Sequence, residues 1–412
     1  MLYIIYGFLC TTLVVFSKDA YVESWECRSD TIEFTNYIPT ASAKGLCVVR
    51  STPYASSFDL ERDYGIPRDS KVHIFFYNSD QRTRQNIGTM AQSPFDIPFD
   101  QLPNPKQVWL GKPGSYEEGL GKLAILTPEV VAAASASEIR CGRRVTMGWE
   151  MTKLDYPNLN RQPCHHEIVP LLGGVAFDDI YTMNPQQSSQ WDGLRHFSQT
   201  VPGKSERLFY GGTTSEEIND RQNDRIGLQH WAREGIAGRG VLIDYATWAE
   251  KKGIKYTTFS THQVRFTNIL EIAKENNITF QKGDILFVRV GVTKEWDTSM
   301  TDDQKQAYAD NPSPEHAGVE ATTEVLRWLW DTGFAAIASD AISWEVYPPQ
   351  SPDIFLHEYV LAGWGMPIGE LFDLEALART CQELQRWSFF VASVPLNMPG
   401  GVSSPPNMMA IF

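Results

Sequence analysis

Sequence features that mark several common enzyme classes are missing from this chain of 412 residues. It contains no G-x-S-x-G elbow, which excludes the usual serine α/β-hydrolase site, and no G-x-x-x-x-G-K-[ST], which excludes a P-loop. Residues 119–124 fit G-x-G-x-x-A by spacing, but they do not follow a strand and open a helix, so no dinucleotide site is expected. The six cysteines form no C-x-x-C pair. Reduced thiols in an intracellular protein are therefore predicted.

An excess of basic charge is also missing. The chain has 36 Lys and Arg against 50 Asp and Glu, which gives a net charge of -14. This balance argues against a nucleic-acid partner or an anionic membrane partner that binds through charge. A hydrophobic content of 42% and an aromatic content of 12% instead predict a globular protein with a well-buried core.

The apolar run at the start of the sequence is too short for an ordinary membrane-spanning helix. Residues 2–16 are apolar, but a span needs about 20 residues, and no basic residue precedes this run and no A-x-A-like cleavage site follows it. A cytoplasmic location is predicted. Two alternatives stay open: the segment is a signal or anchor, or it is a buried strand or leader. Residues 1–95 as a whole are interpreted as an N-terminal leader or extension of unclear role.

Regular patterns of helices and strands begin after a proline- and glycine-rich stretch at 95–114. Thr127, followed by Pro128 and Glu129, predicts a helix start, since threonine caps and proline fits the first turn. Strands are predicted at 240–244, 284–290, 334–338 and 387–396, and amphipathic helices at 267–277 and 319–332. This alternation indicates an α/β or mixed α+β fold, with one domain of catalytic size over residues 96–412.

Two separate segments contain possible metal ligands. One carries Gln190, Asp192 and His196, and the other carries His357 and Glu370. Two carboxylates with one or two imidazoles can hold a divalent ion and leave room for water. The sequence HEYVL at 357–361 lacks the second histidine of a zincin motif. From spacing alone, a hydrogen-bonded surface or half-buried His196 is the simpler interpretation.

Read together, these segments resemble the cyclase family of metal-dependent hydrolases, which includes bacterial kynurenine formamidase and isatin hydrolase. The family signature H-x-G-T-H-x-D-x-P-x-H lies over residues 186–196, with Asp192 and His196 in register. The second family cluster, a histidine followed by I-x-E-x-L-x-L, matches His357 and residues 368–374. Residues 283–291 and 338–340 resemble the two strands that lie between these clusters in the family. The similarity begins near residue 99 and looks closest to the fungal branch of the family.

The resemblance implies a mixed β/α swivelling fold, usually a homodimer, with a divalent metal in a pocket. It implies that Asp192, His357 and Glu370 are metal ligands and that His196 is the catalytic acid/base. Both earlier signature histidines are replaced, by Gln186 and Gln190. An amide oxygen is neutral like imidazole but is a weaker, harder ligand. Zinc should therefore bind less tightly, and the site should favour manganese or magnesium. Zinc or manganese is the expected cofactor, with Gln190 a possible further ligand.

The predicted function is hydrolysis of an amide, formamide or lactone bond in a small metabolite, resembling the kynurenine formamidase (arylformamidase) of tryptophan catabolism. Two alternatives stay open: a secondary-metabolite cyclase or dehydratase, and a metal-free protein of the same fold that binds a ligand without turnover.

Other polar and aromatic residues have simpler interpretations. His165 and His166 are adjacent on an expected strand, so they point to opposite faces and a structural role is favoured. Asp244 and Asp340 each end an apolar strand, where a cap for the next turn is the common reason for a carboxylate. Near the motifs lie three tryptophans that fit either a substrate pocket or the core: Trp191, Trp344 and Trp364.

Overall fold

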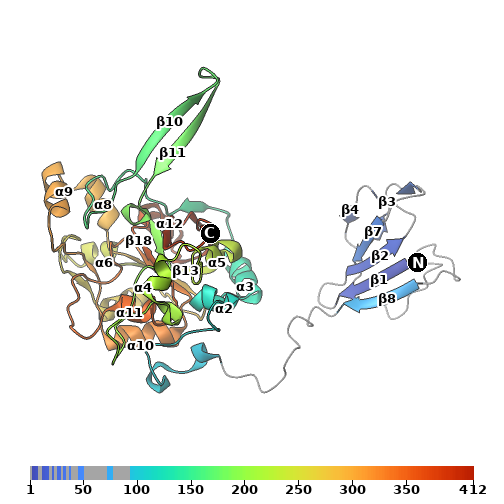
Figure 1. Cartoon of the computed structure of the whole chain (residues 1–412), viewed down its shortest axis with the longest axis horizontal. Coiled ribbons are helices and arrows are strands. Elements are labelled where there is room, and N and C mark those ends of the chain that lie inside the picture. Colours follow the sequence, from blue (N-terminus) through green and yellow to red (C-terminus); the bar gives the residue numbers. More distant parts are fainter. Residues whose placement is uncertain are drawn as a thin grey trace. The chain divides into compact units, whose positions relative to one another are not determined.

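The computed structural model describes residues 93–412 throughout and, before them, the backbone of eight short strands. The chain divides into two compact units, Met1–Ala91 and Gln92–Phe412 (Figure 1). The described part of the first unit consists of strands, four of which form a sheet in the order β7-β2-β1-β8. Their bounds are β1 (Leu2–Gly7), β2 (Thr12–Ser17), β3 (Tyr21–Val22), β4 (Glu26–Arg28), β5 (Thr31–Glu33), β6 (Tyr37–Ile38), β7 (Gly45–Arg50) and β8 (Val72–Tyr77).

The apolar segment 2–16 falls on β1 and β2, which pair antiparallel. The side chains of these strands lie outside the described residues. A signal, an anchor or a buried strand therefore all stay predictions for this segment.

A nine-stranded mixed sheet forms the centre of the second unit, in the order β20-β12-β18-β17-β15-β13-β19-β21-β9. The four middle strands, from β18 to β13, run parallel to one another, and the strands outside them are added antiparallel. The bounds are β9 (Arg144–Thr146), β12 (Gln190–Asp192), β13 (Ile236–Asp244), β15 (Ile285–Arg289), β17 (Ala336–Ser339), β18 (Ile368–Glu370), β19 (Ser388–Ser393), β20 (Ser403–Ser404) and β21 (Met408–Ile411).

Helices cover the middle of this sheet. Every residue of β15 and β17 is buried, which is typical of parallel strands covered on both faces. Helix α3 packs against β13 and β19, α6 packs against β15, and α7 packs against β13. The helices are α2 (Tyr116–Leu120), α3 (Pro128–Glu138), α4 (Ser215–Asn219), α5 (Gln229–Glu234), α6 (Tyr245–Lys251), α7 (Phe266–Glu275), α8 (Val292–Thr298), α9 (Asp302–Ala309), α10 (Thr323–Thr332), α11 (Leu356–Val360) and α12 (Glu375–Leu384). This is the mixed α/β fold that the sequence predicted.

Most predicted elements are present with shifted ends. The Thr127 side chain accepts a hydrogen bond from the Val130 N–H and caps α3, as expected. The helix predicted at 319–332 begins only at Thr323, because residues 318 and 319 instead form strand β16 (Gly318–Val319), which pairs with β14 (Gln263–Val264). The sequence patterns did not predict β12 or β18, which are three residues long each and too short for a periodicity.

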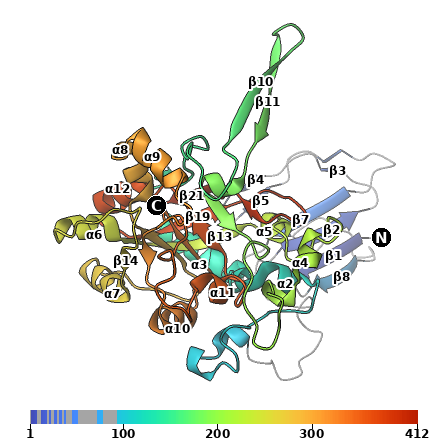
Figure 2. The ribbon, with the colours of Figure 1, turned by 60° about the vertical axis from the view of Figure 1, so that its left-hand side comes forward.

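A two-stranded hairpin, β10 (His165–Leu171) with β11 (Ala176–Thr182), projects from the second unit (Figures 1 and 2). His166 pairs with Asp179, with 2.6 Å between Nε2 and Oδ1, and stacks on the Tyr181 ring. His165 and His166 therefore lie on the hairpin, and the structural role that was favoured for them stays a prediction. The hairpin also exposes large apolar side chains, such as Leu172 and Phe177.

One helical stretch in the described part of the chain, Tyr116–Glu138, is long and apolar enough to cross a membrane by length and composition. It is weak evidence for a span, because the stretch is three successive pieces: α2, a 3-10 segment (Gly121–Ile125) and α3, with non-helical residues at 126 and 127.

Candidate metal and acid–base site

Strands β12 and β18 bring the two predicted ligand segments together. They pair antiparallel with Gln190 opposite Glu370, so these two side chains share one face of the sheet. Asp192 lies two residues beyond Gln190 and points to the same face, because side chains alternate along a strand. Residues 180 positions apart in the sequence are thus direct neighbours, with the Gln190 amide donating to Glu370 Oε2 at 2.9 Å.

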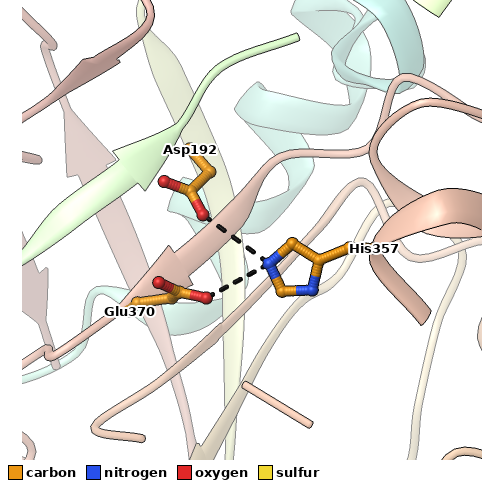
Figure 3. Close-up of side chains that lie close together, drawn as sticks. All are labelled: Asp192, His357 and Glu370. Atoms are coloured by element: carbon orange, nitrogen blue, oxygen red, sulfur yellow. Dashed lines mark ion pairs between the residues drawn. The ribbon is translucent and has the colours of Figure 1, made fainter. Parts of the chain in front are cut away.

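His357 on helix α11 completes the cluster from a third direction (Figure 3). Its Nε2 lies 3.8 Å from Asp192 Oδ2 and 3.3 Å from Glu370 Oε1. One ligand atom from each of the three residues falls within 4.8 Å of the others. The structure therefore places Asp192, His357 and Glu370 where a single ion would contact all three.

The protonation of this triad is strongly perturbed. Burial raises the pKa of Glu370 to about 7, and the neighbouring Asp192 carboxylate adds to the effect. Burial also opposes charge on Asp192, but His196, His357 and the Gln186 amide together lower its pKa. Burial opposes the proton on His357, yet the carboxylates around it, led by Glu345, raise the pKa of its imidazole well above the usual value. Without an ion, a proton on His357 acts as the counter-charge of the carboxylates.

The residues present fit a divalent cation. Asp192 Oδ2 and Gln190 Oε1 are buried and have no hydrogen-bond partner, which is costly unless another group satisfies them. Within residues 93–412, no lysine or arginine lies at ion-pair distance from Asp192 or Glu370. Two carboxylates, one imidazole and a free amide oxygen form a mixed O/N ligand set that zinc and manganese both accept.

Glu345 is a site residue that the sequence patterns did not reveal. Its Oε1 accepts a hydrogen bond from His357 Nδ1 at 2.9 Å and another from the His357 backbone N–H at 3.2 Å. A carboxylate that accepts a hydrogen bond from Nδ1 fixes the proton on that nitrogen. The other ring nitrogen, Nε2, faces Asp192 and Glu370 and is left free to bind a metal. Glu345 precedes His357 by 12 residues. No motif links the two, so only the tertiary structure shows the contact.

The two glutamines that replace signature histidines hold the carboxylates in place. The Gln186 amide donates to Asp192 Oδ1, and Gln190 donates both to Glu370 and to Gln186 Oε1. With its NH₂ group occupied in this way, Gln190 presents only its unpartnered Oε1 as a ligand atom. Gln190 thus lies in the cluster as predicted.

His196 lies beside the triad and nearer to solvent. Its Nε2 is 3.6 Å from Asp192 Oδ2, and its side chain is 20% exposed, whereas that of Asp192 is fully buried. Burial lowers the pKa of His196, only partly offset by Asp192, so the imidazole is neutral at pH 7. A neutral, partly exposed imidazole at this place can accept a proton from a group that approaches the triad.

Two phenylalanines border the site. The rings of Phe197 and Phe355 lie 5.2 Å and 5.4 Å from the His357 ring, measured between centroids, and both side chains are partly exposed. The three tryptophans that fitted either a pocket or the core are all fully buried and belong to the core: Trp191, Trp344 and Trp364. The aromatic side chains next to the ligands are therefore phenylalanines.

Comparison with known proteins finds several similar structures and one matching family. A crystal structure described as a novel cyclase is 24% identical, with a TM-score of 0.62, and the match covers 72% of this chain and 97% of that one. Isatin hydrolase A from Labrenzia aggregata, bound to benzyl benzoate, is 13% identical, with a TM-score of 0.44, and the match covers 68% of this chain and 97% of that one. A predicted metal-dependent hydrolase from Bacillus stearothermophilus is 12% identical, with a TM-score of 0.37, over 66% and 98% of the two chains. No curated protein sequence matches this chain.

The fold is thus that of a cyclase-like α/β protein. The model of the Cyclase family matches residues 115–346, more than half of the 412 residues. The chain belongs to the Cyclase family, which confirms the resemblance to that family, while the fungal branch stays a prediction. His357 and Glu370 lie beyond the matched residues, and their place beside Asp192 comes from the structure.

Proposed function

We propose that this protein is a metal-dependent hydrolase of an amide, formamide or lactone bond. One observation carries the proposal: within residues 93–412, Asp192, Glu370 and His357 Nε2 form a buried cluster without a lysine or arginine counter-ion, and His196 stands at its more exposed side. In this proposal the three residues hold the ion, and Gln190 Oε1 serves as a fourth ligand.

His196 has the catalytic role in this proposal. When bound, a divalent ion supplies Lewis-acid chemistry that lowers the pKa of water towards ~7 and polarises a carbonyl. His196 takes a proton from the attacking water, because its lowered pKa leaves it neutral, and returns the proton to the leaving nitrogen or oxygen. Glu345 keeps His357 in the required tautomer, and the rings of Phe197 and Phe355 limit the access of bulk water.

An aryl formamide of the N-formylkynurenine type is the substrate that the family resemblance favours. The edge-to-face pair of Phe197 and Phe355, with centroids 5.0 Å apart, offers an apolar surface on which an aromatic ring of a substrate would pack. Arylformamidase activity is accordingly the specific form of the proposal, with residues 96–412 as the catalytic domain.

Metal analysis together with an activity screen tests the proposal. The full chain, purified without chelator, should contain about one equivalent of divalent ion and should hydrolyse members of a panel of aryl formamides and lactones. Asp353→Asn, which changes an exposed carboxylate, is the matched control for Asp192→Asn. If no zinc, manganese or magnesium binds to the purified chain, or if the His196→Ala variant hydrolyses the panel at the wild-type rate, the proposal is wrong. A protein that binds a panel compound without turnover would favour the ligand-binding alternative.

The expected homodimer and the cytoplasmic location stay predictions. Light scattering on the full chain at several concentrations measures the first directly.

A further inference from the structure

Arg161 lies next to the candidate site without being part of the triad. Its Nη1 is 3.4 Å from the backbone oxygen of Gln186, whose side chain in turn donates to Asp192. The charge of the guanidinium reaches the site. It opposes the burial that raises the pKa of Glu370, and it adds to the burial that lowers the pKa of His196. Arg161 is therefore linked to the ligand Asp192 through a single intervening residue, Gln186.

Within residues 93–412, Arg161 differs from three other buried or half-buried arginines in having unused donors. Arg289 is paired with two carboxylates, Arg225 with Glu118 and Glu217, and Arg195 donates to four backbone carbonyls. A guanidinium has five N–H donors, and for Arg161 only the long contact to Gln186 is present. Within residues 93–412, no carboxylate lies at ion-pair distance from it.

The backbone before Arg161 adopts a costly conformation. Leu159 and Asn160 both have φ of 56°, in the left-handed region that disfavours a residue such as leucine. Just before them, the buried Asn158 side chain donates to the carbonyl oxygens of Tyr308 and Asn311, at 2.6 Å and 3.1 Å, and anchors the loop. Two successive residues with positive φ, anchored on one side, determine where the chain places Arg161.

Arg161 is also accessible. It is half-buried and lines an open cavity of about 870 Å³ between residues 155–161 and residues 306–312. Two exposed carboxylates, Asp155 and Asp310, also line this cavity, but solvent screens them and neither pairs with Arg161. A small molecule can thus reach the guanidinium from solvent.

We propose that Arg161 binds a carboxylate of the substrate, so that this enzyme prefers anionic substrates. A guanidinium with unpaired N–H groups matches a carboxylate through two parallel hydrogen bonds. A divalent ion balances the charges of Asp192 and Glu370, and Arg161 balances that of Glu345, so no net negative charge of these groups opposes an anionic substrate. This inference rests on the proposed function and adds the charge class of the substrate to it.

Two substrates that differ only in charge test the inference. The probes are 4-formamidobenzoate and its neutral isostere 4-formamidobenzamide, compared on the full chain loaded with manganese. Wild type should hydrolyse the benzoate with the higher kcat/KM. Arg161→Gln should lower kcat/KM for the benzoate by about 10- to 100-fold, mainly through KM, and change that for the benzamide by less than about threefold. Arg161→Lys should retain part of the preference, and Arg221→Gln, at an exposed arginine, should retain all of it.

Binding of benzoate, measured by calorimetry without turnover, separates this inference from the proposed function. Weaker binding to Arg161→Gln than to wild type and Arg221→Gln supports the role of Arg161, even if neither formamide is hydrolysed. Equal benzoate affinity in all three proteins overturns it, and so does an equal loss of kcat/KM on both substrates. Metal content and the urea unfolding midpoint of Arg161→Gln should match wild type, and a variant that loses either is replaced by Arg161→Met for the same comparison.

Discussion

Two buried clusters of carboxylates in this domain differ in what neutralises them. In the first, Asp244 and Glu375 are both paired with Arg289, at 2.7 Å in each case, and the second oxygen of Asp244 accepts a hydrogen bond from Gln382 at 3.0 Å. In the second cluster, as far as the described residues show, Asp192 and Glu370 meet only histidines and glutamine amides, and Asp192 Oδ2 accepts no hydrogen bond.

The difference separates a structural cluster from a functional one. A buried carboxylate is costly unless a cation compensates it. The Arg289 cluster contains its own cation and needs nothing from solution. The Asp192 cluster contains only histidines that can take up a proton, which a metal ion can replace. A buried carboxylate by itself therefore does not indicate a metal site. A buried carboxylate without an arginine or lysine beside it does indicate one.

The largest expected effect comes from removing a carboxylate of the unpaired cluster. Asp192→Asn should weaken divalent-metal binding by more than about 100-fold and abolish hydrolysis, because it removes a negative ligand. Metal titration with a competing chelator measures this. If Asp192→Asn binds metal as tightly as wild type, Asp192 is not a ligand.

His196 should separate metal binding from catalysis. His196→Ala should leave metal affinity within about threefold of wild type and lower kcat by about 10²- to 10⁴-fold, the usual contribution of a general acid/base. His165→Ala, at an exposed histidine of the hairpin, is the control and should change neither value. Equal loss of metal in His196→Ala and Asp192→Asn would show that the assigned roles are wrong.

The paired cluster should respond in stability and not in metal binding. Arg289→Gln leaves the buried Asp244 and the half-buried Glu375 without their cation, so the free energy of unfolding should fall by about 3 kcal/mol. Urea unfolding measures the loss, and metal affinity measured under native conditions should be unchanged. A variant that loses metal at unchanged stability would contradict the distinction between the clusters.

Metal affinity should rise with pH. Glu370 has a pKa raised to about 7 and His357 has one raised above its usual value, so below pH 7 both hold protons that the ion must displace. Below pH 7, where two protons are displaced, the affinity should increase by up to roughly 100-fold per unit. Above pH 7, where Glu370 has lost its proton, the increase should fall to roughly tenfold per unit, and it should vanish once His357 has lost its proton as well. Calorimetry in buffers of different ionisation enthalpy counts the released protons. Constant affinity over this range would mean that the ion displaces neither proton.

The smallest effect is expected from restoring a signature histidine. Gln190→His should shift the preference from manganese towards zinc by roughly tenfold, since imidazole is a softer ligand than an amide oxygen. The substitution also removes the hydrogen bond from Gln190 to Glu370 Oε2, which limits the shift towards zinc. Competition between the two ions measures the shift, and an unchanged preference would mean that Gln190 is not a ligand.

Several features could be predicted from the sequence because they depend on local order. The α/β class followed from helix and strand periodicity, and the Thr127 cap followed from residue type at a helix start. Asp244 was expected as a cap, and its Oδ1 does accept the Thr247 N–H at 3.1 Å at the start of α6. Asp340, the other strand-end carboxylate, instead accepts the N–H groups of Val290 and Gly291 from the neighbouring strand's end.

For the candidate site, the residues themselves were predictable and their surroundings were not. Asp192, His196, His357, Glu370 and Gln190 were proposed from the resemblance of their motifs to those of the family, and their roles stay predictions. The sequence also determines their types and thus the metals they can hold. Only the tertiary structure decided that β12 pairs with β18, that Glu345 accepts a hydrogen bond from His357 Nδ1, and that Arg161 donates to the backbone oxygen of Gln186. Such contacts join segments up to 180 positions apart, and they arise from strand pairing and packing that no local pattern of residues encodes.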